Sequence, residues 1–284
     1  MTRYLVAGAA GMLGTDLMSA LDGRDATGLT RAQLDVTDLE AVRAAVAGFD
    51  VVINASAYTR VDDAETDEAA ARAVNAVGAQ NLALAAADSG AVLVQVSTDY
   101  VFDGTATEPY PEDAPLSPVS AYGRTKAEGE RLALAAHPDG TVIVRVAWLY
   151  GAHGGNFPKT MLKLAADRPQ LSVVTDQVGQ PTWTVDVAGH ILSLLDAGVR
   201  SGVLHATNSG RASWYEFARA VFERAGLDPE RVTPTDAASF VRPAPRPAFS
   251  VLGHAAWAAH GLPEPRDWRE ALDAAFAAGV FATP

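Results

Sequence analysis

Tyr122 and Lys126 lie four residues apart in a stretch, residues 121–137, whose pattern predicts a helix. On a helix this spacing places both side chains on one face. A phenol is a poor acid–base group at neutral pH, but a nearby ammonium favours the phenolate and should lower the pKa of Tyr122. The pair could then exchange a proton with a carbonyl or hydroxyl oxygen, although the same spacing is common in ordinary surface helices.

Two hydroxyl residues, Ser97 and Thr98, stand at the end of the strand expected over residues 92–97. In parallel sheets covered by helices, ligands bind outside the carboxyl ends of the strands. The hydroxyl of Thr98 could therefore hold the carbonyl oxygen of a substrate.

Three glycines follow the first expected strand and open the first expected helix. Residues without side chains let the backbone approach a pyrophosphate, whose charge then faces the N–H groups of the helix N-terminus. Strand, glycines and helix occur in the order that a dinucleotide-binding motif requires, although a glycine turn needed only for packing is the alternative. We expect cofactor contacts at Gly8, Gly11, Met12, Leu13 and Gly14.

The end of the second expected strand indicates which nicotinamide cofactor is bound. NAD-preferring sites place an acidic residue there, whereas this chain has Thr30 and Arg31. A guanidinium beside a hydroxyl suits the 2′-phosphate of NADP. Asp35 lies at about the right distance from the glycines to contact the ribose, or else the adenine. These residues favour NADPH, and NADH stays possible. The charged nicotinamide would act on the pKa of Tyr122 in the same direction as Lys126.

The elements that must position these residues alternate between short apolar runs and longer Ala-rich stretches. That pattern is typical of βαβ units in a parallel sheet. We expect strands over residues 4–7, 26–29, 51–54, 92–97 and 141–146, and helices over residues 12–21, 39–47, 64–89 and 121–137. The predicted fold class is α/β, a Rossmann-type doubly wound parallel sheet.

After residue 150 the alternation fails, and a glycine-rich loop and proline-rich turns follow. We therefore expect a cofactor-binding domain over residues 1–150 and a smaller lobe over residues 151–284. A helix over residues 185–195 should pack back on the first domain. Further helices are expected over residues 157–167, 214–225 and 268–278.

Composition narrows the classes of function. The 284-residue chain has a formal net charge of −12 and no cysteine. It therefore offers no basic surface for nucleic acid or an anionic membrane, and no disulfide or thiolate chemistry. A short apolar run after Arg3 loosely resembles a signal peptide, but its glycines and the helix that follows favour a cytoplasmic protein. The six histidines show no paired metal-ligand spacing, so we expect no catalytic metal.

Together these motifs resemble the extended short-chain dehydrogenases/reductases and, within them, the dTDP-4-dehydrorhamnose reductases, over nearly the whole chain. The matching stretches are residues 8–14, 54–59 with Val61 and Asp62, 97–104, 122–126, Arg145 with Trp148, Asn156 with Phe157, and positions within 176–182. The run over residues 97–104 is the most specific of them. The resemblance implies NADPH-dependent reduction of the C4 ketone of dTDP-4-dehydro-6-deoxy-L-mannose to dTDP-L-rhamnose. It makes Thr98, Tyr122 and Lys126 catalytic, with Tyr122 as the proton donor.

The same resemblance implies that the lobe over residues 151–284 mainly binds the sugar nucleotide, and it implies further binding residues. The cofactor would also contact Val36, Ala55, Ser56, Ala57, Tyr58, Ser97, Tyr122 and Lys126. The small-molecule dTDP-sugar would contact Val61, Thr98, Asp99, Tyr100, Tyr122, Trp148 and Asn156, with a core position as the alternative for Trp148. Arg246 is the expected diphosphate contact, although Phe249 and Gly253-His254 stand where the family more often has Asn and Asp.

Assembly is less defined by the resemblance. Some family members dimerise around a Mg²⁺ ion held by glutamates, one of them at the position of Asp16. The partner ligands cannot be placed in this sequence. A monomer or a homodimer is therefore expected, and a Mg²⁺ ion at a dimer interface is possible but not predicted.

Four other functions are the alternatives. Dehydratases of this fold typically follow the strand-end Thr with Asp and Glu, whereas this chain has Asp99 and Tyr100, so elimination lacks its base. A 4-epimerase would instead keep a tightly bound oxidised cofactor. A related 4-ketoreductase acting on another dTDP-sugar fits the same residues. A non-catalytic regulatory subunit, like the methionine adenosyltransferase β subunit, would keep the fold but would not need an activated phenol.

Overall fold

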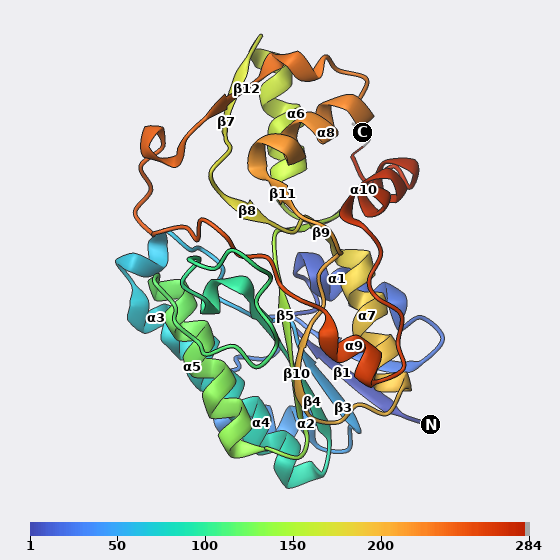
Figure 1. The fold of residues 1–284 in the computed structure, drawn as a ribbon. Coiled ribbons are helices and arrows are strands. Elements are labelled where there is room, and N and C mark those ends of the chain that lie inside the picture. The colour runs from blue at the N-terminus through green and yellow to red at the C-terminus, as the bar shows by residue number, and fades with distance from the viewer. Residues whose placement is uncertain (282–284) are drawn as a thin grey trace.

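The computed structural model describes residues 1–281, and its larger part is a six-stranded parallel sheet (Figure 1). The strand order is β10–β5–β4–β3–β1–β2. Its strands are β1 (Arg3–Ala7), β2 (Asp25–Leu29), β3 (Val51–Asn54), β4 (Val92–Thr98), β5 (Thr141–Val146) and β10 (Gly202–His205). The predicted doubly wound α/β fold is confirmed, and β3 and β5 have the bounds expected from the sequence.

Helices cover both faces of this sheet. One face carries α1 (Met12–Ala20) and α7 (Thr184–Asp196), and the other carries α2 (Leu39–Val46), α4 (Gly78–Ser89) and α5 (Ala121–Ala136). Tyr4 and Val6 pack in one core with Leu17. Leu5, which lies between them, packs in the other core with Leu82. Because both faces are buried, the strands are continuous apolar runs, which made them visible in the sequence.

The helix expected over residues 64–89 is interrupted. A 3₁₀ turn (Asp63–Glu65), α3 (Glu68–Arg72) and a π-helical turn (Ala73–Val77) precede α4. The π turn carries Asn75, whose Oδ1 accepts from the N–H of Tyr58 at 2.8 Å and whose Nδ2 donates to Thr125 Oγ1 at 3.1 Å. Such turns often occur at functional sites. An Ala-rich pattern cannot show where an inward-facing amide widens a turn, and the prediction of one continuous helix was wrong.

The smaller lobe, at the top of Figure 1, packs helices against short strands. Its elements are α6 (Phe157–Asp167), α8 (Trp214–Arg224), α10 (Trp268–Ala277) and the paired strands β7 (Leu171–Val174) and β12 (Val232–Thr235). Phe217 and Trp268 are buried at the centre of its core. Between the lobe and the sheet lie two short ribbons, β6 (Leu149–Tyr150) with β9 (Thr182–Trp183) and β8 (Val178–Gly179) with β11 (Ala212–Ser213). The three helices lie where they were expected.

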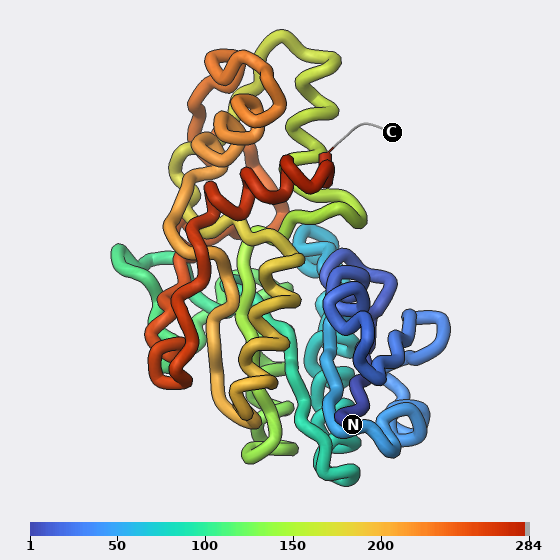
Figure 2. Tube along the Cα trace, turned by 90° about the vertical axis from the view of Figure 1, so that its right-hand side faces the viewer, coloured from blue at the N-terminus to red at the C-terminus, as the bar shows by residue number. Residues whose placement is uncertain are grey.

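After residue 150 the chain returns to the larger part (Figure 2). α7 packs on α1, as expected for residues 185–195. β10 then adds an outer strand beside β5, and α9 (Ala255–Ala259) brings Trp257 into the core of the larger part. The sequence did not reveal β10, because a run of four residues at the edge of a sheet carries little pattern. The larger part therefore also includes α7, β10 and α9, which lie beyond the division expected at residue 150.

Candidate active site

Tyr122 lies in the first turn of α5, facing the end of β4. The helix begins after Ser120, whose hydroxyl accepts from the N–H of Gly123 at 3.1 Å. A Cβ at Gly123 would collide with the carbonyl oxygen of Tyr100, so only glycine lets the start of α5 approach this closely. The rings of Tyr122 and Tyr100 meet edge to face with centroids 5.5 Å apart. The phenol is thereby held at the carboxyl edge of the sheet.

Thr98 connects this phenol to a buried carboxyl. Its hydroxyl donates to Asp99 Oδ1 at 2.9 Å, and it lies close enough to the phenol of Tyr122 to influence the pKa of that phenol. Burial raises the pKa of Asp99 to about 6, while the hydroxyls of Ser250 and Thr98 oppose that rise. The structure therefore brings together the hydroxyls of Thr98 and Tyr122, as the strand-end argument anticipated, and adds a carboxyl beside them.

The pKa of Tyr122 shifts in the direction opposite to the one expected. Desolvation raises it to about 12, the nearby hydroxyl of Thr98 opposes the rise, and the charge of Asp99 adds to it. Lys126 lies one turn further on, and its Nζ donates to the carbonyl oxygen of Val96 at 2.6 Å. Burial lowers the pKa of Lys126 to about 8, with Glu130 opposing. The phenol of Tyr122 is thus neutral at neutral pH, which is the form that can donate a proton.

Arg246 lies beside Tyr100 and Asp62. Its guanidinium pairs with Asp62 Oδ1 at 2.9 Å and donates to the carbonyl oxygen of Ala244 at 2.9 Å. Burial raises the pKa of Tyr100, and the charge of Arg246 opposes that rise. The predicted diphosphate contact and the predicted sugar contacts at Tyr100 and Val61, the neighbour of Asp62, therefore lie in one region.

Trp148 is held in an uncommon backbone conformation. Its φ is +45°, in the left-handed region that residues with side chains rarely adopt. Its indole stacks on Trp214 with centroids 3.5 Å apart and planes at 5°, and it fills the space that a Cβ of Gly179 would need. The side chain keeps partial exposure. This placement between the two parts of the molecule is compatible with a sugar contact, which stays a prediction.

Asn156 has a structural task of its own. It caps α6, with Oδ1 accepting from the N–H of Lys159 at 3.1 Å and Nδ2 donating to the carbonyl oxygen of Gly151 at 2.8 Å. Both ends of the amide are used within the chain, and the side chain is buried. A contact between Asn156 and a sugar hydroxyl would compete with these bonds, and it stays a prediction.

The glycine loop fits a pyrophosphate. Gly8 has a φ of +82°, and a Cβ there would lie 2.7 Å from the backbone nitrogen of Ser56. A Cβ at Gly14 would collide with the carbonyl oxygen of Gly8. Gly11 precedes α1 without a side-chain cap among the described residues, so N–H groups of the first turn are free for an anion. Leu13 points into the core, so only its backbone can serve a ligand.

At the end of β2, side chains near the loop are partly committed to one another. Thr30 Oγ1 donates to Gln33 Oε1 at 2.8 Å. Asp35 accepts from the N–H and hydroxyl of Thr37 at 2.9 and 2.7 Å, and these bonds lower its pKa, with a contribution from Arg31. Arg31 is exposed, whereas Val36 is buried in the core under α4. Of this group, the guanidinium of Arg31 is the best placed to receive a phosphate.

Two residues that the sequence did not single out support the site. Asn75 ties the segment after β3, which includes the predicted cofactor contacts Ala55, Ser56, Ala57 and Tyr58, to Thr125 on α5. Glu130 accepts from Ser97 Oγ at 2.5 Å. The side chain of Ser97, a predicted cofactor contact, is therefore turned towards α5. The available signal for Glu130 was its position four residues after Lys126, on the same helix face.

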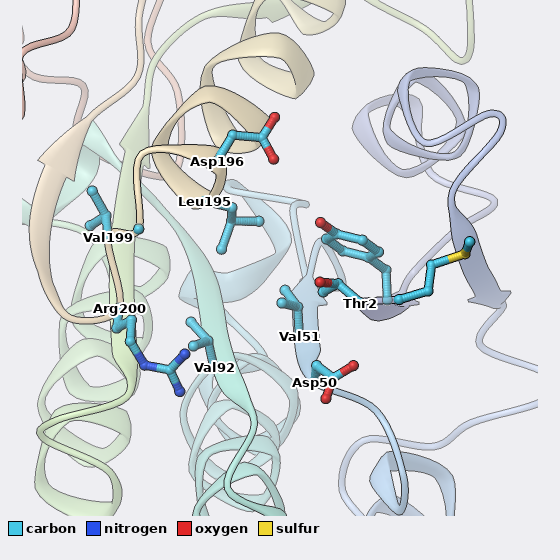
Figure 3. A pocket seen from close by; sticks show the side chains of 11 residues that line it. Thr2, Asp50, Val51, Val92, Leu195, Asp196, Val199 and Arg200 are labelled. Carbon is cyan, nitrogen blue, oxygen red and sulfur yellow. The ribbon is translucent and has the colours of Figure 1, made fainter.

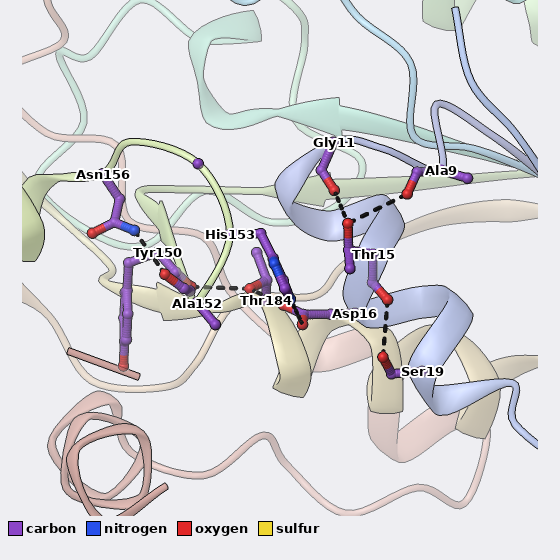
Figure 4. Close-up of polar contacts among 12 residues, drawn as sticks. Ala9, Gly11, Thr15, Asp16, Ser19, Tyr150, Ala152, His153, Asn156 and Thr184 are labelled. Carbon is purple, nitrogen blue, oxygen red and sulfur yellow. Dashed lines mark hydrogen bonds and ion pairs between the residues drawn. The ribbon is translucent and has the colours of Figure 1, made fainter. Parts of the chain in front are cut away.

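Asp16 lies at the junction of α1 with α7 and the loop after β6 (Figure 4). Its Oδ2 accepts from Thr184 Oγ1 at 2.5 Å, and its Oδ1 lies 3.9 Å from His153 Nε2. Within residues 1–281, no group of three or more His, Cys, Asp or Glu side chains is arranged to hold a metal ion. In this structure Asp16 thus joins α1 to α7 by one hydrogen bond, which Thr184 donates.

A cavity of about 640 Å³ lies at the opposite edge of the sheet (Figure 3). Its walls come from the amino ends of β1, β3 and β4 and from the segment after α7, including Asp50, Asp196 and Arg200. The predicted catalytic residues lie at the other ends of these strands.

Within residues 1–281, no helix combines the length and apolar character needed to cross a bilayer.

A family model for the RmlD substrate binding domain matches residues 2–280. The chain belongs to this family. It is 49% identical to the dTDP-4-dehydrorhamnose reductase of Streptomyces griseus, over 97% of this chain and 93% of the relative. It is 50% identical to the probable dTDP-4,6-dihydroxy-2-methyloxan-3-one 4-ketoreductase of Streptomyces antibioticus, over 96% and 94%. The resemblance inferred from the motifs is confirmed.

A solved structure carries the same fold. The dTDP-4-dehydrorhamnose reductase of Bacillus anthracis, determined in complex with NADP, is 36% identical and superposes with a TM-score of 0.93, covering 98% of this chain and 100% of the other. Like its family, this chain is an oxidoreductase.

Proposed function

We propose that this chain uses NADPH to reduce the C4 ketone of dTDP-4-dehydro-6-deoxy-L-mannose, giving dTDP-L-rhamnose. The observation that carries the proposal is the convergence at the carboxyl edge of the sheet of the end of β4, which carries Thr98, with the first turn of α5, which carries Tyr122. The relatives named above, which include dTDP-4-dehydrorhamnose reductases, support the choice of substrate.

The proposed chemistry assigns one task to each side chain. The reduced nicotinamide supplies a hydride to C4. Tyr122, neutral because its pKa is raised to about 12, donates its proton to the oxygen that gains negative charge at C4. Thr98 positions that oxygen by a hydrogen bond. The ammonium of Lys126 then offsets the charge left on the phenolate of Tyr122.

The cofactor would be held mainly by backbone. The loop over residues 8–14 and the uncapped start of α1 would bind the pyrophosphate through N–H groups. The exposed guanidinium of Arg31 would pair with the 2′-phosphate. That pairing distinguishes NADPH from NADH in this proposal.

A related ketoreductase reaction is the second candidate. It is supported by the relative from Streptomyces antibioticus, whose printed name is a 4-ketoreductase of a different dTDP-sugar and whose identity to this chain is 50%. The same Thr98, Tyr122 and Lys126 would serve both reactions. The choice between them depends on sugar contacts of modest energy.

The test follows cofactor oxidation by the purified protein. With dTDP-4-dehydro-6-deoxy-L-mannose and NADPH, we expect loss of reduced-nicotinamide absorbance and formation of dTDP-L-rhamnose, and a lower kcat/KM with NADH. Oxidation only with another dTDP-4-ketosugar would replace the first candidate by the second. No oxidation with any such sugar would refute both.

A further inference from the structure

A buried ion pair between α5 and β5 lies one helical turn beyond Lys126. The side chains of Glu130 and Arg145 are 2% and 3% exposed. The guanidinium of Arg145 grips the carboxylate at two points, with Nη2 2.8 Å from Oε2 and Nε 3.0 Å from Oε1. Ser97 Oγ donates to the same carboxylate at 2.5 Å. One side chain of α5 thus joins the helix to β4 and to β5.

The far side of Arg145 is also occupied. Its Nη1 donates to the carbonyl oxygen of Glu112 at 3.0 Å and faces His205 Nε2 at 3.3 Å, and the guanidinium lies 5.1 Å from the centroid of the Phe102 ring. Burial, with a contribution from Arg145, lowers the pKa of His205 to about 3, so this imidazole is neutral. Glu130 is therefore the anion that balances Arg145.

The ion pair lies next to the proposed catalytic residues on both α5 and β4. Lys126 and Glu130 lie one turn apart on the same face of α5. Lys126 holds the carbonyl oxygen of Val96, Glu130 holds the hydroxyl of Ser97, and the next residue of β4 is Thr98. On the other side, a Cβ at Gly129 would collide with the carbonyl oxygen of Asn75, so α5 is seated closely against the π turn. Contacts with β4 on one side and with the π turn on the other therefore fix how α5 is rotated about its axis and where it lies along β4.

Stability alone does not explain such a pair. Burying two charges costs desolvation free energy that their attraction repays only with good geometry, and apolar residues of similar volume often stabilise as well or better. Beside a reactive group, a buried ion pair can serve the reaction instead of stability. It fixes the positions of neighbouring side chains and sets the electrostatic field that they experience. Lys126, one turn before Glu130 on the same helix, is a group that would respond, since it is also buried.

We propose that Glu130 is a positioning residue of the catalytic site: by holding Ser97 and Arg145 it sets α5 against β4 so that Tyr122 meets Thr98, and it keeps the ammonium of Lys126 charged. The part that concerns turnover rests on the function proposed above. The pKa of Lys126, lowered to about 8 by burial and raised by Glu130, supports the electrostatic part. The other titratable groups around this face are Asp99 and Tyr122 at its open end, and Arg145 and the neutral His205 behind Glu130.

The chain offers a direct measurement, because it contains three lysines, Lys126, Lys159 and Lys163. Protein labelled with ¹³C at the lysine ε carbon gives one signal for each, and the Lys126 signal is identified by its loss in Lys126→Met. In Glu130→Gln we expect the pKa of Lys126 to fall by about one unit. Lys159 and Lys163 should titrate as in the wild type.

Activity should follow the titration. In Glu130→Gln we expect kcat to fall about tenfold near pH 8, the alkaline limb of the kcat profile to move to lower pH, and the KM for NADPH to stay within about threefold. Glu128→Gln is the matched control, because Glu128 lies on the same helix but pairs with Arg72 at the surface. It should leave both the Lys126 pKa and the profile unchanged.

A second variant separates positioning from folding. Glu130→Gln leaves Arg145 buried without its partner, so Glu130→Gln/Arg145→Met removes the unpaired charge as well. The double variant should recover thermal stability and keep the lowered kcat, while the pKa of Lys126 should rise part of the way back towards the wild-type value because the positive charge of Arg145 is also gone. Ser97→Ala, which removes one hydrogen bond and no charge, should lower kcat about twofold to threefold with unchanged KM.

A wild-type Lys126 pKa together with wild-type kcat in the folded variants would overturn the role of Glu130. If the wild-type protein oxidises no NADPH, the proposed function fails, but the lysine titration needs no substrate and still decides whether Glu130 controls Lys126.

Discussion

The surfaces proposed for catalysis and for cofactor binding, named the catalytic wall and the cofactor wall, lie at the same edge of one sheet but are built differently. The catalytic wall is the end of β4 with the facing side of α5, and the cofactor wall is the loop over residues 8–14 with the end of β2. On the catalytic wall, Thr98, Lys126 and Glu130 are buried and bonded to neighbouring elements. On the cofactor wall, Gly11 and Arg31 are exposed, and close backbone packing shapes the loop.

This difference separates two ways of preparing a site. Fixed polar groups act on a reacting atom without rearrangement, which favours burial and mutual hydrogen bonds. A loop of backbone N–H groups needs free donors and little side-chain bulk, and the ligand completes it. Substitutions on the catalytic wall should therefore lower kcat, and substitutions on the cofactor wall should raise the KM for the cofactor.

Tyr122→Phe should produce the largest effect. The ring and its edge-to-face contact with Tyr100 remain, while the proton donor is lost. We expect kcat to fall about a thousandfold, with the KM for NADPH within about threefold of the wild type. Steady-state kinetics with both substrates varied gives the two constants.

The control for this change is Tyr215→Phe, which removes a phenol from α8 in the smaller lobe. It should leave kcat unchanged. A Tyr122→Phe protein that turns over at a rate near that of the wild type would break the comparison, because the catalytic wall would then supply no proton.

The sequence allowed accurate prediction where a residue pattern is compatible with only one kind of structural environment. β3, β5 and α6 have the expected bounds because continuous apolar runs and a strong amphipathic period have few other solutions. The convergence of Thr98 with Tyr122 was also predictable, since strand ends and helix starts meet at one edge of a parallel sheet.

The rest depended on tertiary packing that a single sequence does not display. Glu130 and Arg145 resemble solvent-exposed charges in a helix and a strand, and only the packing of α5 on the sheet buries them together. The direction of the Tyr122 pKa shift was mispredicted for the same reason, because burial and the charge of Asp99 both raise this pKa and no lowering by Lys126 accompanies them. Asn75 was hidden in an Ala-rich helical pattern that gave no sign of a π turn.

Asp99→Asn tests the cost of burying charge on the catalytic wall. The folded-state pKa of about 6 is above the ordinary carboxyl value of 3.8, so the folded protein holds a proton that the unfolded chain has released between these pH values. The contribution of Asp99 to stability is therefore full below about pH 4 and is lost as the pH rises through 6. The shift corresponds to up to about 3 kcal/mol. Urea unfolding from pH 4 to 7 should show a flatter dependence in the variant.

Buried histidines change the pH dependence of stability in the opposite direction over part of the range from pH 4 to 7. The pKa values of His205 and His254 are lowered to about 3 and about 4, so their contribution to stability rises with pH. The difference between wild type and variant isolates Asp99 from them. Asp103→Asn is the control, because hydrogen bonds lower the pKa of Asp103 and its contribution is lost only in acid. A wild-type profile in Asp99→Asn would show that the carboxyl is not strained by burial.

Arg31→Ala tests the cofactor wall and should have the smallest effect. Arg31 is exposed and its side chain shapes no part of the core, so its removal should leave folding and kcat unchanged. Loss of one exposed charge-assisted contact to the 2′-phosphate should raise the KM for NADPH about tenfold, and the KM for NADH, which has no such phosphate, by less than about twofold. Arg43→Ala, at the surface pair of α2 with Asp88, should change neither constant. Equal increases for the two cofactors would mean that the end of β2 does not distinguish them, and the cofactor wall would then consist of the glycine loop alone.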